Sequence, residues 1–387
     1  MVMSMGSRIA ILHPFLCILG GGEMLAFTAA KILKDYDYDV EIYTLTPVDR
    51  SRIEAMCGFS FNIPVKILSY RIEKPINEVL WGSNSKYEKL LMSLELESIV
   101  TDTLKDFDLV IDTQSDLILP SDVKYIHFPW LAPIDGDPRY RALYDAARRK
   151  LIKLIASSKV LTNSSWTAAL IRKFFDVYPD ILYPPVKVKE IAEVCKCIEK
   201  EPNLVVTISR FAPDKRVDSV VRIAAMVPNM RFVVIGSLSA NNRATYEDLL
   251  RLKDELRANN IEFLPNLPRD KLIEYLCRAT IYLHPMYAEH FGISIVEAMA
   301  AGAVPVVYRD GGAWHDVVSR VSSDLGYSTI EEAANVIKTL ASSKEQLVNL
   351  SKRSRRVARR FDTEVFGKKL IDLVEIILRV RRFSTLS

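Results

Sequence analysis

Short apolar runs alternate with segments of helical periodicity through the first half of the chain. The pattern predicts strands at residues 8–12, 39–45, 109–112 and 123–127, and further apolar runs at 151–155 and 160–163 continue the strand series. It predicts helices at 23–34 and 165–175, with Gly20-Gly21-Gly22 as the turn before the first helix. Strands that alternate with helices form a parallel sheet, in which ligands bind at the carboxyl ends of the strands. The first half therefore predicts a Rossmann-like α/β domain.

The same alternation starts again after a stiff break at Tyr183-Pro184-Pro185-Val186, where two prolines hold the backbone extended. Strands are predicted at 204–209, 231–236, 261–264, 281–284 and 304–308, and helices at 217–226, 245–258, 271–278 and 294–301. A last helix is predicted at 364–380. We therefore expect one domain at residues 1–187, a second at 188–363, and a C-terminal helix at 364–387.

Composition agrees with two globular α/β domains. The 387 residues are 49% hydrophobic and 26% charged, so the chain can build large cores. A net charge of +4 and an isoelectric point near 8.6 are only mildly basic and do not indicate a nucleic-acid partner. No run of about 20 uncharged apolar residues predicts a transmembrane helix. The apolar stretch 9–19 is broken by His13-Pro14, so a signal peptide is not expected either.

The cysteines suggest a reducing environment. They number five and are scattered along the chain, at Cys17, Cys57, Cys195, Cys197 and Cys277. An odd and scattered set argues against a disulfide framework and favours a cytoplasmic location. Cys195 and Cys197 form a C-x-C pair, but no second pair completes a zinc site.

Residues 289–312 combine two acids, a glycine turn, a helix and a second glycine pair. Glu289 stands before Phe291-Gly292-Ile293, and Gly311-Gly312 follows the next strand. The start of a helix offers N–H groups and a positive dipole end to phosphate, and Gly292 lets a ligand approach the backbone closely. Glu297 lies about one turn inside the helix. Two carboxylates here could accept hydrogen bonds from different hydroxyls of one ligand, such as a ribose and a hexose.

This block resembles the Glu-x7-Glu signature of the retaining glycosyltransferases of family four, which have the GT-B fold. Within that family, E-H-F-G and G-G are most similar to the dolichol-pathway alpha-1,2-mannosyltransferase type, which extends lipid-linked oligosaccharides. The resemblance implies that Glu297 binds the nucleotide ribose, Glu289 binds the transferred sugar, and the backbone of Phe291, Gly292 and Ile293 meets the diphosphate. His290, inside the turn, would help to shape the site. Read alone, Glu297 could instead be a capped or solvated residue of an ordinary helix.

The same resemblance implies the arrangement of the whole chain. Two Rossmann-like domains would face each other across a cleft, with the first on the acceptor side and the second binding the nucleotide sugar. The final helix would cross back to the first domain. Its apolar face could otherwise contact a membrane.

Two cations follow the first strand of the second domain. Arg210 and Lys215 project from the strand end, where both could reach one diphosphate. Arginine binds phosphate as a planar fork and lysine as a compact point charge. The resemblance implies that they neutralise the departing nucleotide diphosphate without a metal ion. The alternative from the residues alone is a pair of solvated surface cations.

Two features of the first domain are candidates for the same site. Gly20, Gly21 and Gly22 permit close backbone approach and open a helix whose N-terminus can face an anion. The G-x-G-x-x-G fingerprint is not satisfied, which disfavours NAD. His127 ends a strand, in His127-Phe128-Pro129-Trp130. The resemblance implies that the glycines meet the donor diphosphate or the acceptor and that His127 is the active-site histidine; a plain turn and a structural histidine are the alternatives.

Two other patterns are less specific. Asp135-Gly136-Asp137 lies in a proline-rich loop whose turn chemistry explains it, so we expect no metal there. The basic run Arg148-Arg149-Lys150, with Lys153 and interleaved apolar residues, could dock on anionic lipid or form a solvated helix face. Any membrane contact is expected to be peripheral.

The resemblance implies a retaining hexosyltransferase without a cofactor. The expected reaction moves mannose from GDP-mannose to a lipid-linked or other glycan acceptor by metal-independent same-face substitution, at the cytoplasmic face of a membrane. Glu289 would position the sugar while Arg210 and Lys215 hold the leaving charge. UDP-glucose and UDP-N-acetylglucosamine are alternative donors, since the base is selected by loops such as 265–268. A non-catalytic nucleotide-sugar-binding subunit of a transferase complex is a further alternative.

Overall fold

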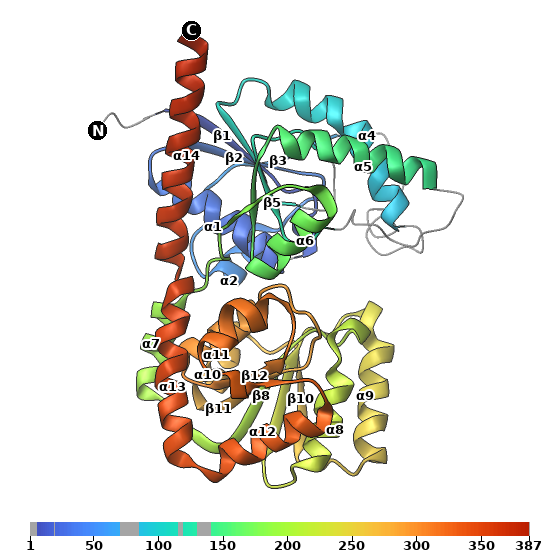
Figure 1. Cartoon of the computed structure of the whole chain (residues 1–387), viewed down its shortest axis with the longest axis vertical. Helices are drawn as coiled ribbons and strands as arrows, with labels where there is room; N and C mark the ends of the chain where they lie inside the picture. The colour runs from blue at the N-terminus through green and yellow to red at the C-terminus, as the bar shows by residue number, and fades with distance from the viewer. Residues whose placement is uncertain (1–5, 19, 70–84, 115–118, 130–140, 387) are drawn as a thin grey trace. The chain divides into compact units, whose positions relative to one another are not determined.

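The computed structural model describes residues 6–18, 20–69, 85–114, 119–129 and 141–386. The chain divides into two compact units. The first comprises residues 1–163, 167–183 and 366–387, and the second comprises 164–166 and 184–365. Each unit contains one parallel sheet with helices packed against it (Figure 1). The predicted pair of α/β units with parallel sheets is confirmed.

The sheet of the first unit has the strand order β3-β2-β1-β4-β5-β6-β7 in the described part of the chain. Its strands are β1 (Arg8–Leu12), β2 (Asp39–Thr44), β3 (Val65–Ile67), β4 (Leu109–Asp112), β5 (Val123–Ile126), β6 (Lys159–Thr162) and β7 (Asp180–Ile181). β1 pairs in parallel with β2 on one side and with β4 on the other. The chain therefore changes its direction of winding between β1 and β4, and a crevice opens at the carboxyl ends of these two strands.

Helices of the first unit cover this sheet. They are α1 (Gly21–Asp35), α2 (Arg50–Cys57), α4 (Ser85–Leu104), α5 (Arg141–Ala156) and α6 (Ser165–Phe175), whose first two residues belong to the second unit. Two predictions are wrong here. Gly21 and Gly22 form the first turn of α1 rather than a turn before it, because the Gly20 N–H is bound by the Glu23 carboxylate and the helix starts one residue later. Residues 151–155 lie inside α5, since Leu151 and Ile155 repeat at helical spacing on its buried side.

The C-terminal helix α14 (Thr363–Leu386) adds a face to the core of the first unit (Figure 1). Its buried side chains belong to the cluster that contains Ile9 and Ile11 of β1; they are Phe366, Leu370, Ile371, Val374 and Leu378. The predicted C-terminal helix is confirmed, and it runs six residues beyond the expected end at residue 380. In the described parts of the chain, no helix has the length and apolar character needed to cross a membrane.

The sheet of the second unit has the order β10-β9-β8-β11-β12-β13 among the described residues. Its strands are β8 (Glu201–Ile208), β9 (Arg231–Gly236), β10 (Ile261–Pro265), β11 (Ala279–His284), β12 (Val304–Tyr308) and β13 (Gly326–Tyr327). All neighbouring strands are parallel. The winding direction changes between β8 and β11, so the crevice of this unit lies at their carboxyl ends.

The helices of the second unit are α7 (Val188–Val194), α8 (Val217–Met226), α9 (Arg243–Glu255), α10 (Arg269–Arg278), α11 (Ile293–Ala300), α12 (Ile330–Ser342) and α13 (Lys344–Ala358). α8 matches its predicted bounds, and α10 starts two residues before the predicted residue 271. α12 and α13 were not predicted.

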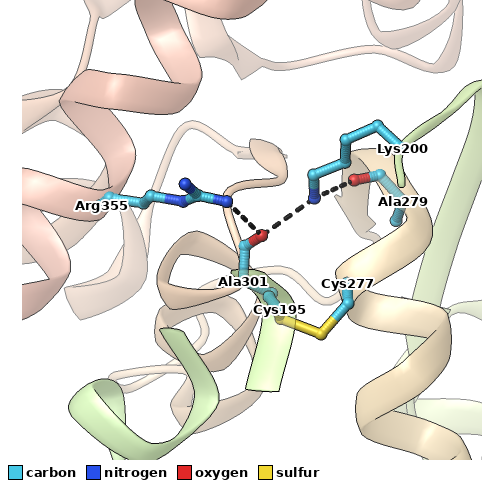
Figure 2. The surroundings of a disulfide bond; sticks show 6 residues. All are labelled: Cys195, Lys200, Cys277, Ala279, Ala301 and Arg355. Atoms are coloured by element: carbon cyan, nitrogen blue, oxygen red, sulfur yellow. Dashed lines mark hydrogen bonds between the residues drawn. A yellow bond between two sulfur atoms is a disulfide. The ribbon is translucent and has the colours of Figure 1, made fainter. Parts of the chain in front are cut away.

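A disulfide joins the segment after α7 to α10, which corrects the interpretation of the cysteines (Figure 2). Cys195, in the single turn Cys195–Cys197, is bonded to Cys277 across a sequence separation of 82 residues. Cys17, Cys57 and Cys197 are free thiols. The odd, scattered pattern hid the pair because only the fold brings residues so far apart in sequence together.

Two cations, the half-buried Lys200 and the exposed Arg355, stand beside this disulfide (Figure 2). Lys200 Nζ donates to the carbonyls of Ala279 and Ala301, at 2.6 and 2.9 Å, and Arg355 donates to the Ala301 carbonyl at 3.2 Å. These carbonyls lie at the C-terminal ends of α10 and α11, where positive charge is favourable. Burial, together with the nearby charge of Arg355, lowers the pKa of Lys200 to about 7. The pair therefore fixes two helices that carry residues of the candidate site.

Candidate active site

The crevice of the second unit collects most of the residues that the sequence singled out. Arg210 and Lys215 follow β8, and Glu289 follows β11. Because β8 and β11 are neighbours whose connections leave in opposite directions, their carboxyl ends border the crevice. The structure thus brings these three side chains to one edge of the sheet.

Arg210 and Lys215 face a common carboxylate. The same oxygen of Asp214 lies 3.8 Å from a terminal nitrogen of Arg210 and 3.9 Å from Lys215 Nζ. Asp214 and Arg210 are about half exposed, whereas the Lys215 side chain is 20% exposed. Lys215 Nζ also lies 2.9 Å from the sulfur of Met286. A single anionic oxygen can therefore lie between the two cations. The Asp214 carboxylate oxygen occupies that position in this structure.

Glu289 is held as a carboxylate by a histidine that the sequence analysis missed. His284, the last residue of β11, places its Nε2 3.2 Å from Glu289 Oε2, and its side chain is almost fully buried. Burial opposes ionisation of Glu289, but the hydrogen bond and charge of His284 outweigh it, aided by Lys215 and His290, and hold the Glu289 pKa well below its usual range. Glu289 is thus a fixed, ionised acceptor beside Lys215.

His290 is packed rather than exposed in the turn. Its ring stacks on the indole of Trp166 at 5.9 Å, and burial lowers its pKa, with Lys215 adding to the effect and Glu289 opposing it. The glycine pair explains the tight turn around it. A Cβ on Gly312 would lie 1.9 Å from the His290 carbonyl oxygen, and one on Gly311 would lie 2.4 Å from that of Glu289. Gly311 and Gly312 therefore support the turn by packing against its backbone.

The glycine turn has a left-handed backbone at Gly292. Gly292 adopts a φ of 85°, in the left-handed region, and stands at the N-cap of α11, whose first residue is Ile293. A Cβ at Gly292 would meet the side chain of Ile295 at 2.4 Å. The Phe291 side chain is buried and packs edge-on against Phe361 at 5.3 Å, so only its backbone is placed to meet a ligand.

Glu297 has a partner in the structure. Arg269, the first residue of α10, donates to both of its carboxylate oxygens, Nη1 to Oε2 at 3.2 Å and Nη2 to Oε1. Glu297 is buried, whereas the Arg269 side chain is 39% exposed. The interaction with Glu297 overcomes the effect of burial and raises the pKa of Arg269. No signal in the sequence links two residues 28 positions apart on different helices.

In the first unit, the glycine loop and His127 meet at the crevice between β1 and β4. A Cβ on Gly22 would lie 3.4 Å from His127 Nε2. His127 Nε2 donates to the Thr113 carbonyl at 3.1 Å, and Thr113 directly follows β4. Gly20 donates its N–H to the carboxylate of Glu23 at 2.6 Å. The predicted elements of this unit are therefore brought together, alongside buried polar residues that the sequence analysis had passed over.

The structure describes the basic run on α5 but not the Asp-Gly-Asp loop. Trp130 and Asp135-Gly136-Asp137 lie outside the described residues. In the basic run on α5, Arg148 donates to the Phe174 carbonyl at 2.7 Å and Lys150 pairs with Glu97. Two of its charges are therefore engaged within the first unit.

Sequence comparison relates the second unit to a known family. Residues 192–357 match the family model described as glycosyl transferases group 1. The chain is similar to GDP-Man:Man(3)GlcNAc(2)-PP-Dol alpha-1,2-mannosyltransferase of Homo sapiens, with 30% identity over 242 residues, which cover 58% of this chain and 49% of that protein. It is 28% identical over 243 residues to the enzyme of the same name from Dictyostelium discoideum, covering 57% and 48%. The chain spans about half the length of these relatives.

Structure comparison extends the likeness over nearly the whole chain. Sucrose-phosphate synthase from Thermosynechococcus elongatus aligns with a TM-score of 0.74 at 14% identity, covering 97% of this chain and 100% of that one. Anabaena HepE in complex with UDP aligns with a TM-score of 0.71 at 17% identity, covering 95% and 99%. The chain therefore has the GT-B fold, and the match to the glycosyl transferases group 1 model lies within its second unit.

Proposed function

We propose that the chain is a retaining mannosyltransferase that moves mannose from GDP-mannose to a lipid-linked oligosaccharide. The activity named for its mannosyltransferase relatives, which use GDP-Man and a Man(3)GlcNAc(2)-PP-Dol acceptor, supports both the donor and the acceptor. The observation that carries the proposal is the convergence of Lys215 and an ionised Glu289 at the crevice of the second unit.

In the proposed reaction, one bond forms and one breaks at the anomeric carbon. The bond from C1 to the β-phosphate oxygen breaks as the acceptor hydroxyl oxygen attacks from the same face, so the configuration is retained. The hydroxyl proton passes to the leaving phosphate oxygen. No other reactant is required, and the products are GDP and the extended glycan.

The side chains of the second unit divide the work in this reaction. Arg210 and Lys215 stabilise the negative charge that develops on the diphosphate, in the position that Asp214 now marks. Glu289 accepts hydrogen bonds from the hydroxyls of the transferred sugar, and Glu297 accepts one from the ribose. Phe291, Gly292 and Ile293 present backbone to the diphosphate. Positioning and electrostatic stabilisation then supply the catalysis without a metal ion.

The first unit takes the acceptor side of the reaction. Gly20, Gly21, Gly22 and His127 are proposed to contact the donor phosphate or the acceptor, which the closeness of Gly22 to His127 supports. A lipid-linked acceptor lies in a membrane, so we propose a peripheral contact of the chain with the cytoplasmic face. The basic run at 148–153 is the proposed contact, and flotation with anionic vesicles tests it; absence of binding would remove this part of the proposal.

Two measurements on the purified chain test the donor and the activity. A thermal-shift panel of GDP, UDP, GDP-mannose and UDP-sugars reports binding and base preference together. We expect stabilisation by GDP and GDP-mannose and little effect of UDP. Radiolabelled GDP-mannose with a lipid-linked oligosaccharide then reports transfer, which we expect to persist in excess EDTA. Preference for UDP would replace the donor, and tight binding without transfer or donor hydrolysis would favour a non-catalytic subunit.

A further inference from the structure

An unbroken series of hydrogen bonds connects the glycine loop of the first unit to His127. Gly20 N donates to Glu23 Oε2 at 2.6 Å, and Glu23 Oε1 lies 3.4 Å from His13 Nε2. His13 Nδ1 lies 2.8 Å from the hydroxyl of Thr113, whose backbone carbonyl accepts from His127 Nε2 at 3.1 Å. The two candidate elements of this unit are thus joined through three residues that have no role in the proposed reaction.

The direction of each bond follows from its partners. The Glu23 carboxylate only accepts, so His13 donates to it through Nε2–H. His13 Nδ1 then accepts from the Thr113 hydroxyl when the ring is neutral and donates to it when the ring is protonated. The His13 and Glu23 side chains are both buried, at 1% and 7% exposure, and their contact forms a buried ion pair when His13 is protonated. Burial disfavours the charge on Glu23, but the hydrogen bond and charge of His13 outweigh it and lower the Glu23 pKa.

The position of these residues follows from the topology of the sheet. His13 comes directly after β1 and Thr113 directly after β4, the two strands that border the crevice of this unit. Glu23 lies in the first turn of α1. The neighbouring buried acid, Asp112, is paired with Lys124, so it does not replace Glu23 as the partner of His13. Buried polar groups that are fully paired in this way fix one arrangement of the elements they join.

We propose that His13 and Glu23 are positioning residues that hold the glycine loop and His127 in one fixed geometry. This inference rests on the proposed function, in which the loop and His127 contact the reacting molecules. The Glu23 carboxylate fixes the Gly20 amide, and His13 fixes Thr113 and through it the His127 ring. Displacement of such groups by about 1 Å can cost roughly 100-fold in rate. The network therefore acts on the turnover number rather than on binding of the nucleotide to the second unit.

The test uses the full chain and initial rates of transfer from GDP-mannose. His13→Asn is made alone and together with His127→Gln. We expect His13→Asn to lower kcat by roughly 10- to 100-fold with little change in the donor KM. In the His127→Gln background it should have no more than about a twofold further effect, because the group it positions is already gone. Equal losses in both backgrounds would mean a merely structural role and overturn the proposal.

Two conservative substitutions of Thr113 test the same proposal if His13→Asn does not fold. Thr113→Val removes the hydroxyl that binds His13 with almost no change of shape, whereas Thr113→Ser keeps it. We expect roughly a tenfold lower kcat for the first and near-normal kcat for the second. Glu41→Gln is the control for these variants, since Glu41 pairs with Lys66 on β2 and β3, away from the network, and its loss should leave kcat unchanged.

The outcomes separate the two proposals. If the wild-type chain transfers mannose and Thr113→Val and Thr113→Ser have the same kcat, the positioning role is wrong and the proposed function stands. If the wild-type chain binds no nucleotide and transfers nothing, the proposed function itself fails.

Discussion

Arg269 and Glu297 form a two-point ion pair in the second unit, with the guanidinium of α10 donating to both carboxylate oxygens on α11. The carboxylate proposed to bind ribose is therefore already oriented by a cation. Each carboxylate oxygen has further lone-pair capacity, so a ribose hydroxyl can be added without removal of Arg269. The guanidinium of Arg269 neutralises the negative charge of the buried Glu297 carboxylate and fixes the plane in which this carboxylate accepts hydrogen bonds.

Replacement of Arg269 should weaken nucleotide binding. Arg269→Lys keeps the charge but replaces the planar fork with a single point, which leaves one Glu297 oxygen without its partner. We expect the KM for GDP-mannose to rise about tenfold, which corresponds to about 1.4 kcal/mol, and the thermal shift by GDP to shrink. Arg278→Lys is the control, because Arg278 lies on the same helix and pairs with Glu201. Equal KM values for both variants would show that the fork has no part in binding.

Loss of both Arg210 and Lys215 should abolish transfer and leave a folded protein. Arg210 is half exposed, so its removal costs little packing, while the developing diphosphate charge loses both cations. We expect Arg210→Ala with Lys215→Ala to reduce kcat at least 100-fold, with a melting temperature close to that of the wild type. Lys271→Ala, on an exposed ion pair of the same unit, serves as the control. Near-normal turnover of the double variant would contradict the assignment.

His284 should set the acid limit of activity through Glu289. In the wild type the Glu289 pKa is depressed, so its ionised form contributes stability above its unfolded pKa and loses that contribution only as pH falls through the depressed folded pKa. His284→Phe removes the hydrogen bond and leaves burial to act on Glu289, so its pKa must rise. We expect the acid limb of kcat/KM against pH to move to higher pH. His315→Phe, at an exposed histidine, should leave the profile unchanged.

The disulfide between Cys195 and Cys277 should stabilise the second unit. A bridge across 82 residues restricts the unfolded chain, and removal of such bonds typically costs about 2–4 kcal/mol. We expect the Cys195→Ser and Cys277→Ser double variant to unfold at a lower denaturant concentration than the wild type. Reductant should lower the unfolding concentration of the wild type and leave that of the double variant unchanged. Cys197→Ser, at an exposed free thiol, is the control. Denaturation curves that do not respond to reductant would refute the bridge.

Much of the fold could be predicted because each core strand is a short apolar run with clear borders. β1, β4, β9 and β12 match their predicted bounds. The failure at residues 151–155 has the opposite cause, since an apolar run that short has no distinct period and its place on α5 depends on the core it faces. The amphipathic helices α12 and α13 were not predicted, because their apolar residues are interleaved with charged residues and form no long apolar run.

The candidate site was predictable where its residues are contiguous or end a strand. Glu289, Gly292 and Glu297 share one turn and helix, so their spacing carried the signal. His284 ends a predicted strand, as His127 does, so its position alone could have marked it as a candidate site residue. The pairing of Arg269 with Glu297 has no counterpart in local sequence, because α10 and α11 meet only after the sheet has formed.

The return of α14 has a consequence for the order of biosynthesis. Phe366, Leu370 and Val374 belong to the core that surrounds β1, yet the ribosome makes them after the whole second unit. The first unit cannot complete its core when its own sheet has emerged, although N-terminal domains usually fold first. Until α14 is synthesised, the apolar surface that will receive it stays exposed to solvent and to chaperones. The unit whose sequence comes first is therefore the last to be finished.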